Sequence, residues 1–314
     1  MAHDVASIGL TVMDIQGRPI ERIPDGGNLD LIEEIRLTVA GTAAGTAIDM
    51  AKLGLNTMIV CAVGDDEKAD FIVRTFEGYG VDTTHATRIK DVSSSATILA
   101  IRPNGDRPAM HVLGASQHFM VDEAAWDAIG ACTYVHMGGN GLLKSFDGAP
   151  TAKFLKAMKQ HDCIVTYDLI GPSDTTMAMI RDCLEHVDYF MPSMEEAEFL
   201  SGKSDPADIA SFFLGLGVGT CIFKWGSKGS YIANKDGNRR IPAFKVDVVD
   251  TTGCGDAYCG GFIRGLKEGW SLDDSCRFAT AASGLVATGL GSDAGIVDFD
   301  TTVDFMNSAK VIEI

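Results

Sequence analysis

The chain has 314 residues, of which 46% are hydrophobic and 22% charged, as in ordinary globular proteins. A chain of this length buries a sizeable core, either as one large α/β domain or as two smaller ones. Its 43 Asp and Glu residues against 26 Lys and Arg give a net charge of −17, which argues against a nucleic-acid or anionic-membrane partner. The charge does not argue against an anionic substrate, because backbone N–H groups hold phosphate inside acidic proteins.

Neither a membrane span nor an export signal is predicted. The apolar runs are shorter than the about 18 residues that cross a bilayer, and Asp4 lies where an export signal would be apolar. Eight scattered cysteines without a CxxC pair predict reduced, buried thiols, so we expect a cytoplasmic protein. Cys132 and His136 lie four residues apart with no second pair to complete a zinc site, and none is expected.

Short apolar runs alternate with longer stretches of helical periodicity along the chain. Predicted strands span Val5–Val12, Thr57–Val63, Ala96–Arg102, Thr133–Met137, Cys163–Asp168, Tyr189–Met191, Thr220–Phe223 and Ser230–Ala233. Predicted helices span Thr42–Leu53, Lys68–Gly78, Asp122–Ala128, Ala152–Gln160, Thr175–Glu185, Glu195–Leu200 and Ala207–Leu214. Largely apolar strands are typical of sheets covered on both faces, so the alternation predicts a mainly parallel sheet with helices on both sides.

Two segments break this alternation. Residues 13–40 are turn-rich and then weakly strand-like, and residues 95–119 contain two strands joined by Pro103-Asn104-Gly105-Asp106, a hairpin signal. Neither segment contains a good crossover helix, so together they predict a small second sheet that acts as a lid. We expect residues 1–314 to form a single unit that carries this lid.

The most informative stretch is Val248–Gly261, which reads VVDTTGCGDAYCGG. A tight Gly253-Cys254-Gly255 turn precedes helical periodicity from Ala257 onward. Such a turn presents unpaired N–H groups and the positive end of the helix dipole, and it suits a transferring phosphoryl group. Asp256, in the first turn, then suits a base that takes a proton from an attacking hydroxyl. The alternative interpretation is that Asp256 merely caps the helix.

This stretch resembles the C-terminal signature DTxGxGDxFxGG of the ribokinase-like, PfkB-type carbohydrate and nucleoside kinases. Asp250 to Asp256 match it in order, with Cys254 where Ala is usual and Tyr258 where Phe is usual. The resemblance implies a ribokinase-like three-layer α/β/α fold and an ATP-dependent kinase that uses magnesium. It also implies that Asp256 is the catalytic base and that an anion hole is formed by the amides of Gly253, Cys254 and Gly255.

Weaker motifs extend the resemblance over nearly the whole chain. Ile8 through Asp14 is similar to the family's opening strand, whose final Asp binds sugar hydroxyls, and residues 40–45 are similar to its substrate-site motif. The resemblance therefore implies a substrate pocket lined by Asp14, Gly41 and Gly45. Residues 114–117 resemble the loop after the lid hairpin. Residues 223–229 resemble the turn that contacts the nucleotide, which implies nucleotide binding by Lys224, Gly226, Lys228 and Gly229.

The sequence departs from the family pattern at two positions. Gly45 stands where the family usually has an Asn that hydrogen-bonds the sugar. Its loss implies either another substrate orientation or a replacement ligand, for which Asn28 is our candidate. Ser193 stands where an Asn is usual, three residues before the Glu that helps to organise magnesium, here Glu196. Without the resemblance, Glu196 would be interpreted as part of a solvated helix start.

Three residues keep two interpretations each. Asp14 is either a substrate ligand at a strand end, where the ligand sites of α/β proteins collect, or a surface turn residue. Lys224 is either a phosphate contact or a strand end that reaches solvent. Asp168 either approaches the phosphate side of the cleft or belongs to a local turn.

We therefore interpret the chain as an ATP-dependent kinase that phosphorylates a hydroxymethyl group of a sugar or sugar-like alcohol, with magnesium bridging the nucleotide phosphates. The resemblance also implies a potassium ion held by Asp250 and Thr252, with Ala287–Ser292 as the far wall. The alternatives are a nucleoside kinase and a non-catalytic nucleotide- or sugar-binding regulator. The open strand edges of the lid are a candidate surface for a homodimer.

Overall fold

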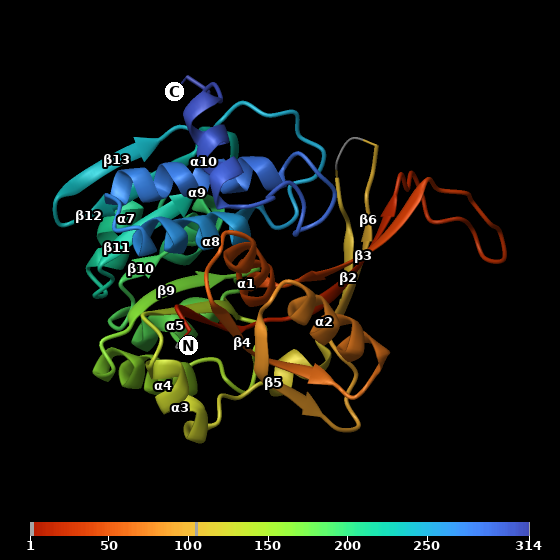
Figure 1. The fold of residues 1–314 in the computed structure, drawn as a ribbon, viewed down its shortest axis with the longest axis horizontal. Helices are drawn as coiled ribbons and strands as arrows, with labels where there is room; N and C mark the ends of the chain where they lie inside the picture. Colours follow the sequence, from red (N-terminus) through yellow and green to blue (C-terminus); the bar gives the residue numbers. More distant parts are fainter. Residues whose placement is uncertain (1–2, 104–105, 314) are drawn as a thin grey trace.

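The computed structural model describes residues 3–103 and 106–313, and these form one sheet of nine strands and one of four (Figure 1). The strand order of the larger sheet is β13-β12-β11-β10-β9-β8-β1-β4-β5. Neighbours from β11 to β5 are parallel, and β12 and β13 are added antiparallel at one edge. The strands are β1 (Val5–Gly9), β4 (Thr57–Gly64), β5 (Asp82–Ile89), β8 (Tyr134–Asn140), β9 (Ile164–Leu169), β10 (Tyr189–Phe190), β11 (Thr220–Lys224), β12 (Ser230–Asn234) and β13 (Gly237–Ile241).

Helices cover both faces of this sheet because successive side chains of a strand point to opposite sides. In β4, Met58 and Val60 pack into one apolar cluster, whereas Ile59 and Cys61 pack into another. The first face packs against α3 (Trp126–Gly130), α4 (Ala149–Gln160), α5 (Thr176–Leu184), α6 (Met194–Ser201) and α7 (Pro206–Leu214). The second packs against α1 (Thr42–Lys52), α2 (Glu67–Gly78), α8 (Cys254–Lys267) and α9 (Leu272–Val286), with α10 (Phe299–Ser308) outside α9. The predicted three-layer fold is confirmed.

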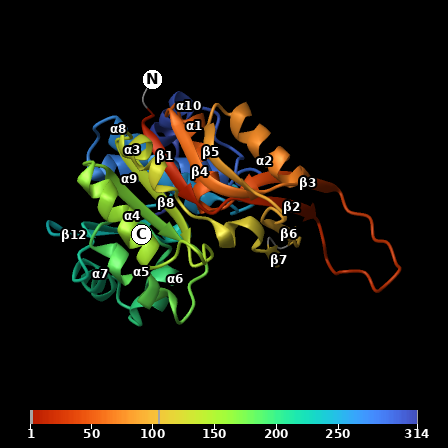
Figure 2. The same cartoon turned by 90° about the horizontal axis from the view of Figure 1, so that it is seen from below.

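The four-stranded second sheet has the order β3-β2-β6-β7 and is built from the two segments that broke the alternation. Its strands are β2 (Val12–Arg18), β3 (Glu34–Ala40), β6 (Ala96–Ala100) and β7 (Ala109–Val112). The segment between β2 and β3 projects away from the rest of the molecule (Figures 1 and 2). β6 and β7 pair antiparallel as predicted, although Asn104 and Gly105 of the predicted turn lie outside the described residues.

The prediction of one opening strand over Val5–Val12 is wrong. β1 ends at Gly9 and β2 begins at Val12, so the chain passes from the large sheet to the second sheet between them. Asp14 therefore lies inside a strand of the second sheet and not at the end of the opening strand. An apolar run looks the same in sequence whether it stays in one sheet or changes sheets, so the break was not predictable from hydrophobicity.

Candidate active site

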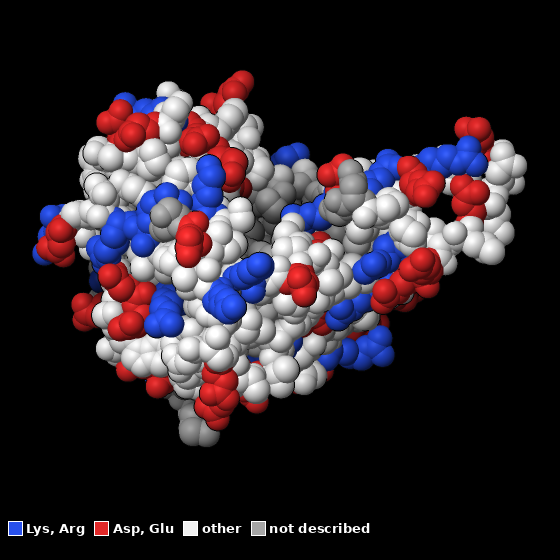
Figure 3. Space-filling view, turned by 90° about the horizontal axis from the view of Figure 1, so that it is seen from above, with Lys and Arg blue, Asp and Glu red and all other residues white. Residues whose placement is uncertain are grey.

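A cleft of about 1300 Å³ lies between the second sheet and the carboxyl ends of β9 and β11, the place where open α/β sheets bind ligands. Figure 3 shows the molecule hollowed between these two parts, with acidic and basic side chains interspersed around the hollow. One end of the cleft is lined from the second sheet, by Asp14, Thr97, Leu99, Ala109 and His111. The other end is lined by Trp225, Gly226, Gly229, Phe244, Val246, Ser283, Gly284 and Ala287.

The glycine-rich turn forms the middle of the cleft at the start of α8. Gly253 is the N-cap of α8 with a φ of 80°, in the left-handed region that favours glycine. A Cβ atom built on Gly253 would lie 2.5 Å from Ser292 Cα, so no larger residue fits without moving that segment. The amide of Cys254 makes a long, 3.4 Å hydrogen bond to Thr251 O. Amides in the first turn have no partner within the helix, and here they face the cleft.

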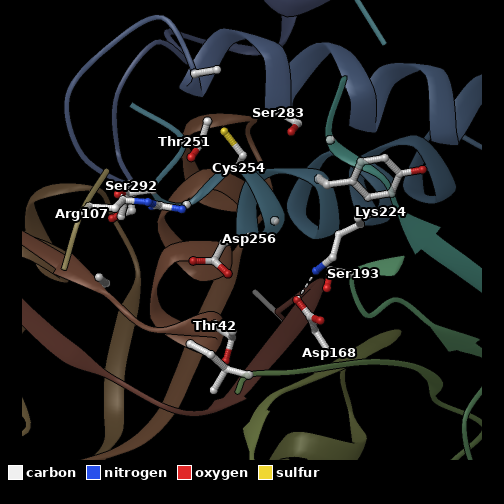
Figure 4. A pocket seen from close by; sticks show the side chains of 18 of the residues that line it. Thr42, Arg107, Asp168, Ser193, Lys224, Thr251, Cys254, Asp256, Ser283 and Ser292 are labelled. Carbon is white, nitrogen blue, oxygen red and sulfur yellow. Dashed lines mark hydrogen bonds and ion pairs between the residues drawn. The ribbon is translucent and has the colours of Figure 1, made fainter. Parts of the chain in front are cut away.

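Asp256 lies at the centre of the cleft, in the first turn of α8 (Figure 4). Its side chain is partly buried, and burial is the main cause that raises its pKa to about 7. The negative charges of Asp168, Asp14 and Glu196 raise the pKa further, whereas Lys224 lowers it. A carboxyl group with a pKa near neutrality is suited to accept and release protons at physiological pH.

Lys224, at the end of β11, forms an ion pair with Asp168 at the end of β9 (Figure 4). Lys224 Nζ lies 2.5 Å from Asp168 Oδ2, and the two side chains are only 13% and 2% exposed. Burial would lower the pKa of Lys224, but Asp168, Cys259 and Glu196 outweigh burial and raise it. A Cβ atom built on Gly255 would lie 3.2 Å from Lys224 Nζ. The structure thus places this ammonium group beside the glycine-rich turn.

Glu196 and Ser193 form a capping box at the start of α6. Ser193 N donates to Glu196 Oε2 at 2.8 Å, and Glu196 N donates to Ser193 Oγ at 3.1 Å. Burial and the nearby Asp168 raise the pKa of Glu196, while Lys224 lowers it. Both residues line the cleft, so the capping box with Ser193 holds the Glu196 side chain at the cleft wall near Asp168 and Lys224. The Ser-x-x-Glu spacing is itself a sequence signal for this cap.

Two of the four predicted substrate residues, Asp14 and Gly41, line the cleft. Asp14 is buried, and burial is the main cause that raises its pKa to about 6. Gly45 is not among the lining residues, because it lies directly behind Asp256. A Cβ atom built on Gly45 would lie 2.5 Å from Asp256 Oδ2, so a larger residue at this position requires the Asp256 side chain to shift.

The hypothesis that Asn28 replaces the missing Asn is corrected by its position. Asn28 lies in the exposed segment between β2 and β3, where its backbone N–H donates to Asp25 O at 3.0 Å. That segment projects away from the rest of the molecule (Figure 2), and Asn28 is not among the residues that line the cleft. The structure therefore does not bring Asn28 to the cleft.

The residues predicted for a monovalent cation come together beside the turn. Asp250 Oδ1 accepts hydrogen bonds from Thr252 N at 3.0 Å and Thr252 Oγ1 at 2.8 Å, and Asp250 Oδ2 accepts one from Gly291 N at 3.0 Å. Gly291 belongs to the predicted far wall. Arg107, which precedes β7, donates to Thr252 Oγ1 and lies 3.8 Å from Asp250 Oδ1. The guanidinium group of Arg107, from the loop that leads into β7, thus already lies beside the Asp250 carboxylate.

Of the predicted nucleotide residues, Lys224, Gly226 and Gly229 line the cleft and Lys228 does not. Lys228 Nζ instead lies 4.5 Å from the centre of the Trp225 ring, and Trp225 itself lines the cleft. Sequence reasoning missed Trp225 as a separate candidate, although a Trp beside the glycine turn was a visible signal. It also missed Arg107, Thr97 and His111, whose roles depend on strand pairing that composition does not reveal.

Within residues 3–103 and 106–313, the fold lacks two features. None of its helices is long and apolar enough to cross a membrane. Among the same residues, no group of three or more His, Cys, Asp or Glu side chains is arranged to hold a metal ion.

Comparison with known proteins agrees with this geometry. The profile described as "pfkB family carbohydrate kinase" matches residues 2–298. A ribokinase of Staphylococcus aureus is 26% identical over 303 residues, covering 94% of this chain and 97% of the relative. An ATP-dependent 6-phosphofructokinase of Thermoanaerobacterium thermosaccharolyticum is 25% identical over 318 residues, covering 98% and 95%. A candidate ribokinase II of E. coli, solved with ATP and Mg²⁺, has a TM-score of 0.84 at 21% identity, covering 98% and 99%.

Proposed function

The chain belongs to the pfkB family of carbohydrate kinases, and we propose that it transfers the terminal phosphoryl group of ATP to a hydroxymethyl group of a sugar or sugar-like alcohol. The observation that carries this proposal is the position of Asp256, with a pKa raised to about 7, beside the Gly253–Gly255 turn in a cleft with two ends. One end suits a polar acceptor, and the other suits an adenine nucleotide.

In the proposed reaction, Asp256 accepts the proton of the acceptor hydroxyl as the oxygen attacks phosphorus. The amides of Gly253, Cys254 and Gly255 hold the charge of the transferring phosphoryl group, aided by the positive end of α8. The Lys224 ammonium group lies next to Gly255 and supplies a positive charge at the same place. Asp168 fixes that ammonium group by its ion pair.

The residues present fit a magnesium ion bound with the nucleotide. Glu196 lines the cleft, and its pKa is raised by burial and by Asp168, so a cation nearby would stabilise its charged form. We propose that Glu196 holds magnesium through water, because Ser193 N already occupies one of its carboxylate oxygens. The magnesium ion supplies charge neutralisation between the phosphates.

The nucleotide end fits an adenine ring because its walls are flat, small or apolar. Gly226 is the first residue of η3 (Gly226–Lys228) and Gly229 follows its end, and Gly284 lies on α9 opposite the segment of Phe244 and Val246. Pockets that bury a planar ligand are lined mainly by such groups with few polar atoms. We propose that Gly226, Gly229 and Trp225 contact the nucleotide, and we assign no contact to Lys228.

A potassium ion at Asp250 remains a proposal. The buried Asp250 carboxylate, Thr252 and the wall at Gly291 fit a monovalent cation, and the Arg107 guanidinium would share the same negative charge. We expect activity to be higher with potassium chloride than with the chloride of a bulky organic cation at equal ionic strength. Equal rates in the two salts would show that no bound monovalent cation is needed.

We also propose that the second sheet acts as a lid that excludes water during transfer, which protects the phosphoryl group from hydrolysis. Its inner face forms one wall of the cleft, which supports this role. The eight cysteines are all free, which supports a reducing compartment such as the cytoplasm.

The proposed function is tested by ADP release from ATP and magnesium in the presence of single acceptors. The acceptors are D-ribose, D-fructose, D-fructose 6-phosphate, a panel of sugar acids, and adenosine. We expect release with at least one sugar. Release with adenosine alone would make the protein a nucleoside kinase. Acceptor binding without release from any acceptor would favour a non-catalytic regulator and overturn the proposal.

A further inference from the structure

Three polar side chains form a row across the inner face of the second sheet. Thr97 of β6 lies opposite Asp14 of β2 on one side and opposite His111 of β7 on the other. Residues paired across neighbouring strands project from the same face of a sheet, and all three line the cleft. The row faces the acceptor end, where the charge of Asp14 is close enough to raise the pKa of Asp256.

The neighbours of Thr97 favour one protonated nitrogen of His111 over the other. Thr97 Oγ1 lies 3.0 Å from His111 Nδ1, and Asp14 is the residue paired with Thr97 on its other side. An ionised carboxylate only accepts, and a hydroxyl has a single hydrogen to donate. The negative charge of Asp14 favours a Thr97 hydroxyl that points its hydrogen toward Asp14 and accepts from the Nδ1–H of His111. Burial lowers the pKa of His111, which keeps the ring neutral and leaves Nε2 as an acceptor.

The acceptor end of the cleft needs a hydrogen-bonding side chain such as His111, because Gly45 supplies none. Asn28 does not supply one either, because it is not among the residues that line the cleft. The wall around the row is otherwise apolar, formed by Val12, Leu99 and Ala109. Arg107 is engaged by Thr252 and Asp250. Asp14 and His111 are therefore the groups of this wall with hydrogen-bonding capacity turned toward an acceptor.

We propose that His111 binds a second hydroxyl of the acceptor through Nε2, with Thr97 as the residue that positions it. The inference rests on the proposed kinase function and defines its substrate class. The acceptor is a polyol that donates one hydroxyl to Asp14 and another to His111. An acceptor with hydrogen or an ether oxygen in place of the second hydroxyl leaves Nε2 unpaired, and such sites reject analogues that lack the donor.

The kinetic test uses matched pairs of variants with the panel acceptor that gives the highest kcat/KM. Thr97→Val keeps the shape of the side chain but removes its hydroxyl, whereas Thr97→Ser keeps the hydroxyl. Thr97→Val and His111→Leu should each raise the acceptor KM about tenfold, the effect of one lost hydrogen bond, with the KM for ATP unchanged. Thr97→Ser and His111→Gln should recover most of the loss. His118→Leu, at an exposed histidine outside the cleft lining, is the control.

The structural test reads the tautomer of His111 directly and needs no turnover. In ¹⁵N-histidine-labelled protein, with His111→Gln used for assignment, we expect the Nδ1–H form in wild type and Thr97→Ser, and the Nε2–H form in Thr97→Val. An Nε2–H form in wild type, or an unchanged acceptor KM in Thr97→Val, would overturn this inference while leaving the kinase intact. Absence of ADP release by wild type with every acceptor would instead overturn the proposed function, and the spectra separate the two failures.

Discussion

At the scale of single residues, the sequence left Asp256 with two interpretations, a helix cap or a catalytic base. The N-cap of α8 is Gly253, and no side chain caps this helix. The Asp256 carboxylate instead faces the cleft beside Asp168, Glu196 and Lys224. A cap would sit at a low pKa because amides stabilise its charged form, whereas burial and neighbouring charges hold the pKa of Asp256 near 7. These observations favour the base.

Substitution of Asp256 by Asn separates these roles kinetically. Asn is nearly isosteric but cannot accept the proton, so kcat should fall by about 10²–10⁴, or roughly 3–5 kcal/mol in the barrier. The affinity for ATP, measured by calorimetry, should change far less. A purified Asp256→Asn protein that retains more than a tenth of the wild-type kcat would falsify the assignment of Asp256 as the base.

The same substitution should also change how the melting temperature depends on pH. The folded-state pKa of Asp256, about 7, lies above its unfolded value of 3.8, so its charged form destabilises the fold. This destabilisation begins near pH 4 and is complete above pH 7. Asp256→Asn should therefore melt higher than wild type at pH 8 and similarly at pH 4. In wild type, kcat/KM should rise with pH through about 7, as the base loses its proton.

The glycine-rich turn was predictable because its residues are contiguous in the chain. Gly253, Cys254, Gly255 and Asp256 follow one another, so the sequence carries both their order and their spacing. Thr97 and His111 face Asp14 only through the pairing of β2 with β6 and of β6 with β7. A one-residue shift in either pairing would turn these side chains to the other face, and the sequence does not determine that register.

At the scale of elements, the close packing of α1 against α8 buries the carboxylate of Asp49, which has no hydrogen-bond partner among the described residues. A Cβ atom built on Gly260 of α8 would lie 3.3 Å from Asp49 Cβ of α1. Asp49 is fully buried, and within the described residues neither of its carboxylate oxygens has a hydrogen-bond partner. Burial is the main cause that raises the pKa of Asp49 well above its usual value, and Lys52 opposes the rise.

Removing this carboxyl group should stabilise the protein. The folded-state pKa of Asp49 is raised, so its contribution to stability becomes more unfavourable as pH rises above 3.8. Asp49→Ala should raise the free energy of unfolding at pH 7 by about 1–3 kcal/mol, the usual penalty of an unpartnered buried polar group, measured by urea unfolding. The gain should shrink toward pH 4. Asp304→Ala, at an exposed carboxylate of α10, is the control, and a loss of stability in Asp49→Ala larger than in that control would contradict the argument.

At the scale of the whole molecule, the layered fold was predictable and its edges were not. The central strands are apolar on both faces and therefore stand out in the sequence. β5 and β13 lie at the two edges of the large sheet, and their largely polar residues resemble loop sequence. The second sheet was predicted as a pair of segments, but its strand order joins β2 to β6 across nearly eighty residues, which composition alone cannot reveal.

The outer face of the second sheet exposes a row of apolar side chains opposite the cleft. Leu37, Ile15, Ile98 and Met110 are paired in turn across its four strands. Leu37, Ile98 and Met110 are 45%, 48% and 55% exposed. Contiguous apolar surface of this kind marks interaction sites, and the edge strands β3 and β7 leave open backbone groups beside it. We propose that this face joins two copies of the chain as a homodimer.

Sedimentation of the purified protein tests the proposed dimer. Wild type should sediment as a dimer at micromolar concentration. Ile98→Lys should sediment as a monomer, because burying an unpaired ammonium group at the centre of the interface is costly. Val297 is 70% exposed and lies outside the second sheet, so Val297→Lys should remain a dimer. Circular dichroism must show both variants folded. A monomeric wild type would contradict the proposed dimer. A folded Ile98→Lys protein that remains dimeric would show that the dimer contact lies elsewhere on the molecule.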